Sequence, residues 1–253
     1  MTFPTQLPST NAALLWGSLP PARLASFLSE SPNGNIDEAL ELYIWNIKLS
    51  TAFLADIAIL EVALRESINK AAAAKWGSHW YLEIPLDERS EQNLAVAWSQ
   101  LSRRVRERPN DGDVPGHLFA NCTFGFWTNL FDKGGHTGKS PRRVRVNYEH
   151  NWEAALRHAF PEGRNVARQQ HAGFTRDWVH GICKRVNSIR NRVAHHEPLI
   201  RGFPMPGQPH RMTCTEAHEE TLKLARMLDP KLAAWLAENS DVPRLIAARP
   251  CTT

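Results

Sequence analysis

Residues 36–75 read IDEALELYIWNIKLSTAFLADIAILEVALRESINKAAAAK, and this stretch decides the fold. Its apolar residues recur every three or four positions, the spacing that gathers side chains on one face of an α-helix. The apolar series comprises Leu40, Tyr43, Ile44, Ile47, Leu54, Ile57, Leu64 and Ile68. Asn35 or Asp37 can cap the start, and Gly77 can end the helix in a left-handed conformation. The stretch predicts one very long helix, or two joined near Ser50.

Helical patterns continue along the rest of the chain. We expect further helices over 87–108, 119–131, 148–160, 175–197, 215–228 and 230–239. Loops rich in Gly, Pro and Asp are expected at 109–116 and 134–141. Pro198 is expected to end the helix over 175–197, because proline cannot donate to the helical hydrogen-bond ladder. Since no alternating strand pattern of useful length appears, the sequence predicts an all-α fold.

Positive charge is concentrated in the middle of the chain. Of the 253 residues, 101–200 hold 17 Lys and Arg against 9 Asp and Glu, a balance of +8. Residues 1–100 hold 6 against 11, a balance of −5. A localised positive field favours a polyanionic partner such as RNA, DNA or an anionic membrane. A solvated surface balanced by the acidic N-terminal part explains the same counts equally well.

The cysteines and the N-terminal residues exclude several classes of protein. The four cysteines are scattered without a CxxC pair, which argues against a zinc ribbon and a disulfide framework. Cys214 and His218 could present two metal ligands on one helix, but a plain helix surface is favoured because further ligands are not evident. No signal-peptide pattern and no long apolar run appear. We therefore expect a cytoplasmic protein with no membrane partner, no metal and no other cofactor.

The segment RNRVAHHEP at 190–198 carries the residue types that RNA cleavage without a metal requires. A base must take the 2′-hydroxyl proton, an acid must protonate the 5′-oxygen, and a cation must stabilise the phosphorane-like charge. Histidine suits the first two roles near neutral pH, and arginine suits the third. His195 is therefore the candidate general acid or base, and Arg190 is the candidate for the phosphate. Glu197 stands alone, without the carboxylate cluster of a metal-dependent nuclease.

The spacing within this segment adds a geometric constraint. At about 100° per residue, Arg190 and His195 lie about 140° apart on a straight helix, whereas Asn191 and His195 share a face. Arginine and histidine converge only if the arginine wraps sideways, the helix is distorted, or a second subunit completes the site. The last possibility predicts a homodimer. The alternative is a helix end with histidines that favour its dipole and surface arginines without a catalytic role.

A basic loop follows the aromatic segment. Its candidate RNA-binding residues are Lys133, Lys139, Arg142, Arg143 and Arg145. A mobile loop with these cations could contact RNA phosphates without reading sequence. A solvated loop with no ligand is the alternative.

Arg190-Asn191-(x)3-His195 resembles the R-x4–6-H signature of HEPN (higher eukaryotes and prokaryotes nucleotide-binding) domains. Longer blocks are similar to the Abi-like family of bacterial abortive-infection proteins of the AbiD/AbiF kind. These blocks are RNRVAHHEPL at 190–199, YIWN at 43–46, EVALR at 61–65, residues 77–81, and TFGFW at 123–127. Together they cover roughly residues 20–235, and their order makes the resemblance more specific than the short signature.

The resemblance implies a HEPN-like helical bundle, commonly dimeric, in which the R-x4–6-H segments of two subunits form the active site. It also implies metal-independent RNA cleavage used in toxin action or anti-phage defence. Carried over by position, Arg190 and His195 form the catalytic pair and Asn191 is the supporting polar residue. Position 197 is Glu, not the tyrosine to which a partner enzyme adds nucleotides in some HEPN toxins, so that control is not expected. We expect an N-terminal helical extension over 1–30, one HEPN-like domain over 31–240 and a tail over 241–253.

Three further residues are expected to support the motif. Glu61 and Arg65 could orient it from the long helix; the alternative is an intrahelical ion pair worth about 0.3–0.5 kcal/mol. His196 is the third. The sequence thus predicts a metal-independent endoribonuclease that leaves 2′,3′-cyclic phosphates, with an antitoxin or an activating phage component as a conceivable partner. The alternatives are a non-catalytic RNA-binding or regulatory HEPN protein, and a purely structural helical interaction module.

Overall fold

The computed structural model describes residues 15–205 and 208–250, and the chain is all-α apart from two small hairpins in these residues. The chain divides into two compact units. Unit 1 comprises the described residues up to Ile57, Ser188–Thr221, and those from Leu236 on; unit 2 comprises Ala58–Asn187 and Leu222–Trp235. Four helices (α3, α11, α12 and α13) contribute residues to both units. No helix of the described residues is long and apolar enough to cross a membrane.

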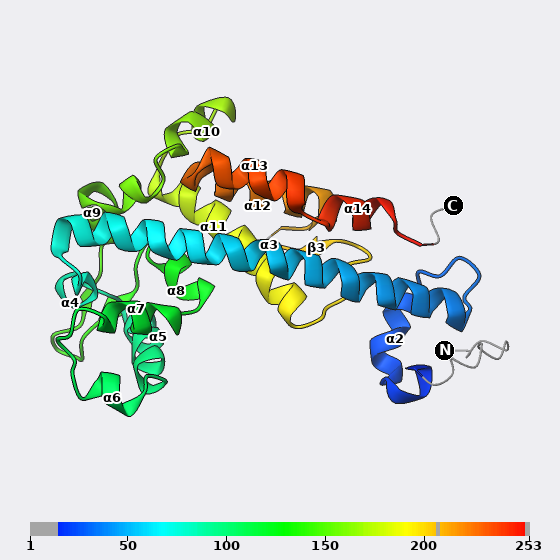
Figure 1. Cartoon of the computed structure of the whole chain (residues 1–253), viewed down its shortest axis with the longest axis horizontal. Helices are drawn as coiled ribbons and strands as arrows, with labels where there is room; N and C mark the ends of the chain where they lie inside the picture. The colour runs from blue at the N-terminus through cyan, green and yellow to red at the C-terminus, as the bar shows by residue number, and fades with distance from the viewer. Residues whose placement is uncertain (1–14, 206–207, 251–253) are drawn as a thin grey trace. The chain divides into compact units, whose positions relative to one another are not determined.

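Helix α3, Ile36–Trp76, is one continuous helix of 41 residues (Figure 1). The side chain of Asn35 accepts a hydrogen bond from the N–H of Glu38 at 2.8 Å and so caps the first turn. At the other end, Gly77 adopts φ +83°, the left-handed conformation that ends many helices. The predicted start and stop are confirmed, and there is no break near Ser50.

The buried face of α3 differs from the predicted one in unit 1. The buried apolar residues there are Ile36, Ala39, Leu40, Leu42, Trp45, Leu49, Phe53 and Ile57. Ile44, which the spacing assigns to the core, is 44% exposed, so that assignment is wrong. Apolar residues occupy several faces of this helix, and periodicity alone cannot rank them. In unit 2 the predicted Leu64 and Ile68 are fully buried.

Unit 1 surrounds its part of α3 with short elements. These are α2 Pro21–Leu28, the end of α11 Arg176–Ala194, strands β3 Phe203–Pro204 and β4 Arg211–Met212, the start of α12 Cys214–Leu228, the end of α13 Pro230–Asn239, and α14 Val242–Ala247. The ring of Phe53 meets that of Phe203 edge-on at 5.4 Å, which ties α3 to the β3–β4 hairpin. The indole N–H of Trp45 donates to the carbonyl oxygen of Leu245 at 2.6 Å, which ties α3 to α14.

Unit 2 is built from short helices around an aromatic core. They are α4 Trp80–Glu83, α5 Glu88–Ser99, α6 Arg103–Arg106, α7 Val114–Ala120, α8 Phe124–Asn129, α9 Tyr148–Ala154, the 3-10 helix Leu156–Ala159 and α10 Gly163–Gln169. Trp80 stacks on Phe119 at 5.3 Å, and Trp152 meets Phe174 at 5.2 Å. Trp80, Trp127 and Trp152 are fully or almost fully buried, so their rings form part of this core.

Several predicted boundaries are wrong because short helices alternate with tight turns in unit 2. The stretch 87–108 forms α5 and α6 rather than one helix, and the Ser102 hydroxyl accepts from Val105 N–H at the start of α6. The stretch 119–131 forms the end of α7 and α8, and 148–160 forms α9 and the 3-10 helix. The predicted loop 134–141 holds strand β1, and α10 and α14 were not predicted. By contrast, α12 and α13 match their predicted ranges within one residue.

Candidate functional site

The motif helix α11 ends in a Schellman turn. The N–H of Glu197 donates to the carbonyl oxygen of Arg192 at 3.0 Å, the long hydrogen bond typical of this turn. His196 adopts φ +55°, the left-handed conformation that the turn requires. The helix therefore ends at Ala194, and the prediction that Pro198 ends it is wrong. We call residues 190–197 the motif turn.

The left-handed residue of the motif turn is a histidine where glycine is usual. A left-handed conformation costs a residue with a side chain about 1–2 kcal/mol. His196 is exposed, so its side chain is not held there by burial. The surrounding backbone contacts must therefore fix this conformation, and strained positions held in this way cluster at functional sites.

The predicted catalytic residues lie on the last turn of α11 and directly after it. Asn191 and His195 are exposed, and Arg190 is half-buried. Nη1 of Arg190 lies 3.5 Å from Oδ1 of Asn191, a long contact that turns the guanidinium toward this amide. The N–H of His195 still donates to the carbonyl oxygen of Asn191 at 3.0 Å, so helical spacing persists to His195. Arg190 and His195 thus keep the angular separation of about 140° expected from an α-helix.

A buried asparagine of α3 fixes the chain that follows the motif. Oδ1 of Asn46 accepts from the N–H of Leu199 at 2.6 Å, and its Nδ2 donates to the carbonyl oxygen of Glu197 at 3.4 Å. The Asn46 side chain is fully buried, so both backbone groups depend on it for a partner. Sequence reasoning quoted Asn46 in the YIWN block but gave it no role. A polar residue on the apolar face of a helix is the signal that could have identified it.

Two arginines add further contacts around the motif turn. Nη2 of Arg23, from α2, donates to the carbonyl oxygen of His195 at 3.3 Å. Nη1 of Arg192 forms an ion pair with Oε2 of Glu197 at 2.5 Å, across the turn. Both side chains of this pair are about one-third exposed. The backbone of His195 is therefore held from two sides while its imidazole remains open to solvent.

A cavity of about 410 Å³ lies beside the motif turn within unit 1. Its polar lining consists of Ser26, Ser29, Arg192, Glu197, Arg201 and Arg211. The lining thus holds three arginines and one glutamate; outside the lining, Glu30 pairs with Arg201, and Arg211 donates to backbone carbonyl oxygens. We call this the arginine cavity. Arg192 and Glu197 belong to both the cavity and the motif turn, and the sequence gave no signal for the contribution of Arg201 or Arg211.

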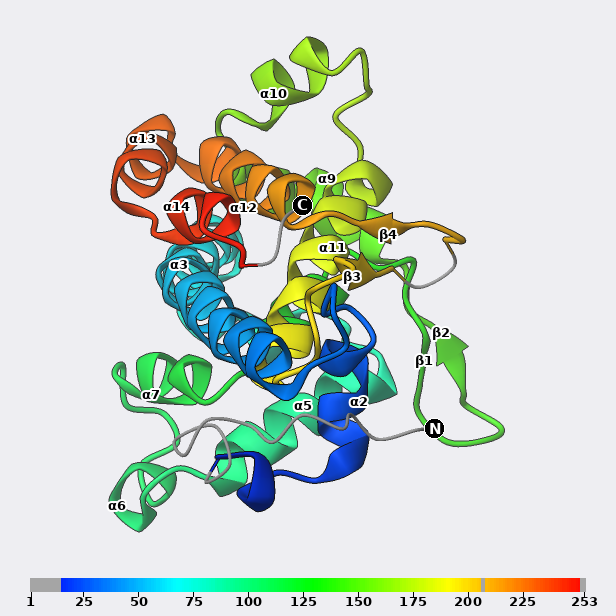
Figure 2. The same ribbon diagram turned by 90° about the vertical axis from the view of Figure 1, so that its right-hand side faces the viewer.

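The predicted basic loop is a hairpin whose base is anchored. Strand β1, His136–Thr137, pairs antiparallel with β2, Val144–Arg145 (Figure 2). The Asp87 carboxylate accepts from Gly135 N–H at 2.9 Å and from the Tyr148 hydroxyl at 3.1 Å. Burial opposes ionisation of Asp87, yet these hydrogen bonds and those from Ser90 hold its pKa below the ordinary value. The expectation of a free loop at 134–141 is therefore corrected.

The five predicted RNA-binding cations of this segment, Lys133, Lys139, Arg142, Arg143 and Arg145, are all exposed. Arg143 reaches Glu88 at 3.5 Å, and both side chains are more than half exposed, so this ion pair is weak. Thr137, on β1, donates its hydroxyl to Glu91 at 2.9 Å. The hairpin therefore offers charge at its surface with little constraint on where each cation points.

The two expected helpers on α3, Glu61 and Arg65, belong to unit 2, whereas the motif turn belongs to unit 1. Nη1 of Arg65 lies 3.5 Å from the carbonyl oxygen of Phe119, and Glu61 also interacts within the chain. Their proposed role in orienting the motif stays a prediction.

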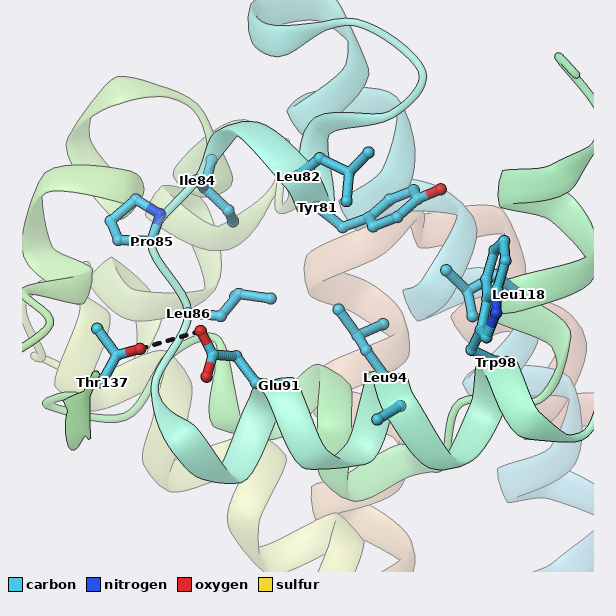
Figure 3. A pocket seen from close by; sticks show the side chains of 11 residues that line it. Tyr81, Leu82, Ile84, Pro85, Leu86, Glu91, Leu94, Trp98, Leu118 and Thr137 are labelled. Atoms are coloured by element: carbon cyan, nitrogen blue, oxygen red, sulfur yellow. Dashed lines mark hydrogen bonds between the residues drawn. The ribbon is translucent and has the colours of Figure 1, made fainter. Parts of the chain in front are cut away.

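A second cavity of about 410 Å³ lies in unit 2 (Figure 3). Leu94 and Trp98 on α5 face Tyr81 and Leu82 on α4, so its lining is largely apolar. Its carboxylate, Glu91, is engaged by the Thr137 hydroxyl, and burial raises the pKa of Tyr81. This lining lacks the histidine and arginine that RNA cleavage requires, whereas the motif turn has both.

Thiol and metal chemistry find little support in the described residues. Burial raises the pKa of the Cys122 and Cys183 thiols to about 12 and that of Cys214 to about 11. Among the described residues, no three His, Cys, Asp or Glu side chains are grouped so that they could hold a metal ion. His218 instead approaches Asp56 at 3.8 Å, and burial lowers the pKa of this histidine.

The model of the family described as Abi-like protein matches residues 23–201, which include most of α2, all of α3, the hairpin β1–β2 and the whole motif turn. Searches of curated proteins and of solved structures gave no significant match.

Proposed function

The chain belongs to the Abi-like protein family, and from this premise we propose that it is a metal-independent endoribonuclease of the HEPN type, acting in abortive infection. The observation that carries the proposal is the motif turn: an exposed His195 whose carbonyl accepts from Arg23, a Schellman turn and buried Asn46 that fix the chain directly after it, and Arg190 five residues earlier. A catalytic histidine needs solvent access for proton transfer and a fixed position relative to the phosphate.

The proposed reaction uses the RNA's own 2′-hydroxyl as nucleophile. His195 takes the 2′-hydroxyl proton while the 2′-oxygen attacks the adjacent phosphorus, and the bond from phosphorus to the 5′-oxygen breaks. A protonated histidine gives its proton to the leaving 5′-oxygen. Arg190 stabilises the added negative charge on the phosphate with its planar fork, and Asn191 holds that guanidinium. The products are a 2′,3′-cyclic phosphate and a 5′-hydroxyl.

A homodimer supplies the second histidine. Because Arg190 and His195 are about 140° apart on one helix, a second copy of α11 facing the first would bring one arginine and two histidines to one phosphate. The hairpin β1–β2 and the supporting residues Glu61, Arg65 and His196 then contribute RNA affinity and positioning. A monomer that cleaves RNA at the full rate at high dilution, in sedimentation and activity measurements, would contradict the shared site.

The test of the activity is cleavage of single-stranded RNA in excess EDTA. We expect wild-type protein to cleave and to leave 2′,3′-cyclic phosphate and 5′-hydroxyl ends, because no step needs a metal. His195→Ala should lower the rate by about 10²–10⁴-fold, the usual contribution of general acid–base catalysis. Cleavage that EDTA abolishes and magnesium restores would contradict the mechanism.

The cellular role follows from the same residues. Expression of the wild-type chain in a bacterial cytoplasm should arrest growth unless an antitoxin is present or a phage component is needed to activate the protein. His195→Ala should relieve that arrest. Equal growth arrest by both proteins would instead favour a non-catalytic RNA-binding or structural role.

A further inference from the structure

We propose that the arginine cavity binds a phosphate group of the RNA strand next to the cleaved bond, and that Glu197 holds Arg192 in place until the RNA arrives. The inference rests on the proposed function for its substrate, since it names where a neighbouring phosphate of the same strand is held. It assigns a binding role to Arg192, Arg201 and Arg211, none of which belongs to the catalytic set or to the β1–β2 hairpin.

The chemistry of the lining fits a phosphate. Three arginines and the serines Ser26 and Ser29 line one cavity of about 410 Å³; Arg192 is paired with Glu197, and Arg201 is paired with Glu30. A guanidinium matches phosphate oxygens with two parallel N–H donors, and hydroxyls donate to the remaining oxygens. Two carboxylates, Glu197 in the lining and Glu30 paired with Arg201, offset two of the three positive charges, so a phosphate still meets an excess of positive charge.

The cavity is tied to the same elements as the catalytic histidine. On α2, Arg23 donates to the His195 carbonyl, and Ser26, three residues later on the same helix, lines the cavity. On the other side, Arg192 lies within the motif turn itself, three residues before His195. Figure 2 labels α2, α11 and the hairpin β3–β4, which contribute Ser26, Arg192 and Arg211 to the lining; Glu197 and Arg201 lie between α11 and β3. A strand whose scissile phosphate lies at His195 can therefore place an adjacent phosphate in the cavity.

The β3–β4 side of the cavity is fixed before any ligand binds. Arg211 donates to the carbonyl oxygen of Arg201 at 2.9 Å and to that of Gly202 at 2.7 Å, which orients its guanidinium. Gly202 adopts φ +73°, and a side chain there would collide with the Met212 carbonyl oxygen. The hairpin can close in this form only with glycine at 202, and the two carbonyl oxygens orient the exposed Arg211 side chain.

Glu197 occupies the position of a competing anion. Its carboxylate pairs with Arg192 at 2.5 Å, and both side chains are about one-third exposed. A phosphate that enters the cavity offers Arg192 the same kind of partner with more oxygens. Removal of the Glu197 charge should therefore free Arg192 and strengthen RNA binding, an effect that partial unfolding cannot produce.

The experiment measures binding of the full-length protein to a fully 2′-O-methylated single-stranded RNA, which cannot be cleaved because its nucleophile is blocked. Fluorescence anisotropy gives Kd over a series of salt concentrations. The variant expected to weaken RNA binding is Arg192→Gln/Arg201→Gln. The variant expected to strengthen RNA binding is Glu197→Gln. The matched control is Arg226→Gln/Lys231→Gln, which removes two exposed charges from α12 and α13.

We expect Arg192→Gln/Arg201→Gln to lower the steepness with which the log of the association constant falls against the log of the salt concentration. The reduction should be about 1.4, since each lost single-strand phosphate contact contributes about 0.7. The control should change the slope less, and Glu197→Gln should tighten binding several-fold. The inference is overturned if the arginine variant matches the control, or if Glu197→Gln fails to tighten binding. Strands with a 5′-hydroxyl or a 5′-phosphate distinguish an internal phosphate from a terminal one. A terminal site would make wild-type protein, but not the arginine variant, prefer the 5′-phosphate, and that result would overturn the internal site.

The binding test of the arginine cavity and the cleavage test of the proposed function can fail independently of each other. Wild-type protein that cleaves RNA in EDTA but whose arginine variant binds like the control would refute the cavity and leave the nuclease intact. Protein that shows the expected slopes and tightening but no cleavage would keep the cavity as an RNA-phosphate site and refute the nuclease.

Discussion

The motif turn and the β1–β2 hairpin both expose basic side chains, but they fix the chain beneath those side chains to different degrees. In the motif turn, the backbone around His195 is held by the Schellman hydrogen bonds, by buried Asn46 and by Arg23. In the hairpin, Asp87 anchors the base, and of the five exposed cations only Arg145 lies on a strand; the others lie before β1 or between the two strands.

The fixed backbone of the motif turn and the less constrained cations of the β1–β2 hairpin suit different functions. Catalysis requires groups that are positioned before the reaction, because reorganisation during the reaction raises the barrier. Binding to an RNA backbone requires only positive charge close to phosphates, and most of its free energy comes from released counterions. The motif turn therefore fits the chemical step, and the hairpin fits affinity. The next predictions test this division, beginning with the larger effect.

Asn46→Ala should disrupt the motif turn. It leaves the Leu199 N–H and the Glu197 carbonyl without their buried partner, which costs about 1–3 kcal/mol of folding stability. We expect the cleavage rate at saturating RNA to fall by at least about tenfold, since about 1.4 kcal/mol of lost positioning corresponds to that factor. Thermal unfolding and single-turnover cleavage, both well below the melting temperature, measure the two effects.

A matched control on the same helix separates positioning from stability. Oδ1 of Asn69 accepts from the Trp80 indole N–H at 3.0 Å in unit 2, so Asn69→Ala also removes a structural hydrogen bond. We expect it to lower the melting temperature without a matching loss of cleavage rate. If the two variants lose rate in proportion to stability alone, Asn46 has no positioning role.

His196→Gly should give the smaller effect, a gain in stability. Glycine adopts the left-handed conformation without the cost that a side chain incurs, so folding stability should rise by about 0.5–1 kcal/mol. His196→Ala removes the same imidazole but keeps a side chain on the strained backbone, so it should show no such gain. Chemical denaturation of both variants distinguishes them; equal stability would mean that the turn at 196 is not strained.

The helices that could be predicted are those whose ends carry local signals. Asn35 and Gly77 bound α3 because a cap and a left-handed stop act within a few residues. In contrast, the end of α11 depends on His196 taking a conformation that its own sequence disfavours, so Pro198 gave a misleading stop. The buried face of α3 also depends on tertiary partners such as Phe203 on β3, which periodicity cannot reveal.

The candidate site was predictable in part for the same reason. Arg190, Asn191 and His195 lie within six residues, so one short segment presents them together. The residues that surround this segment come from distant parts of the chain: Arg23 from α2, Asn46 from α3 and Arg211 from β4. No local pattern relates those positions to the motif, and only the folded chain brings them there.

The most direct test of the division of work is to measure Kd and the single-turnover cleavage rate in EDTA for two variants. His195→Gln removes the proposed acid–base group, and Arg142→Gln/Arg143→Gln/Arg145→Gln removes three exposed hairpin charges. We expect His195→Gln to lose about 10²–10⁴-fold in rate with an unchanged Kd. The hairpin variant should weaken Kd, reduce the salt slope by about 2, and recover the wild-type rate when RNA is saturating. A His195→Gln protein that still cleaves at the wild-type rate, or a hairpin variant that loses rate at saturation with Kd unchanged, would contradict the account.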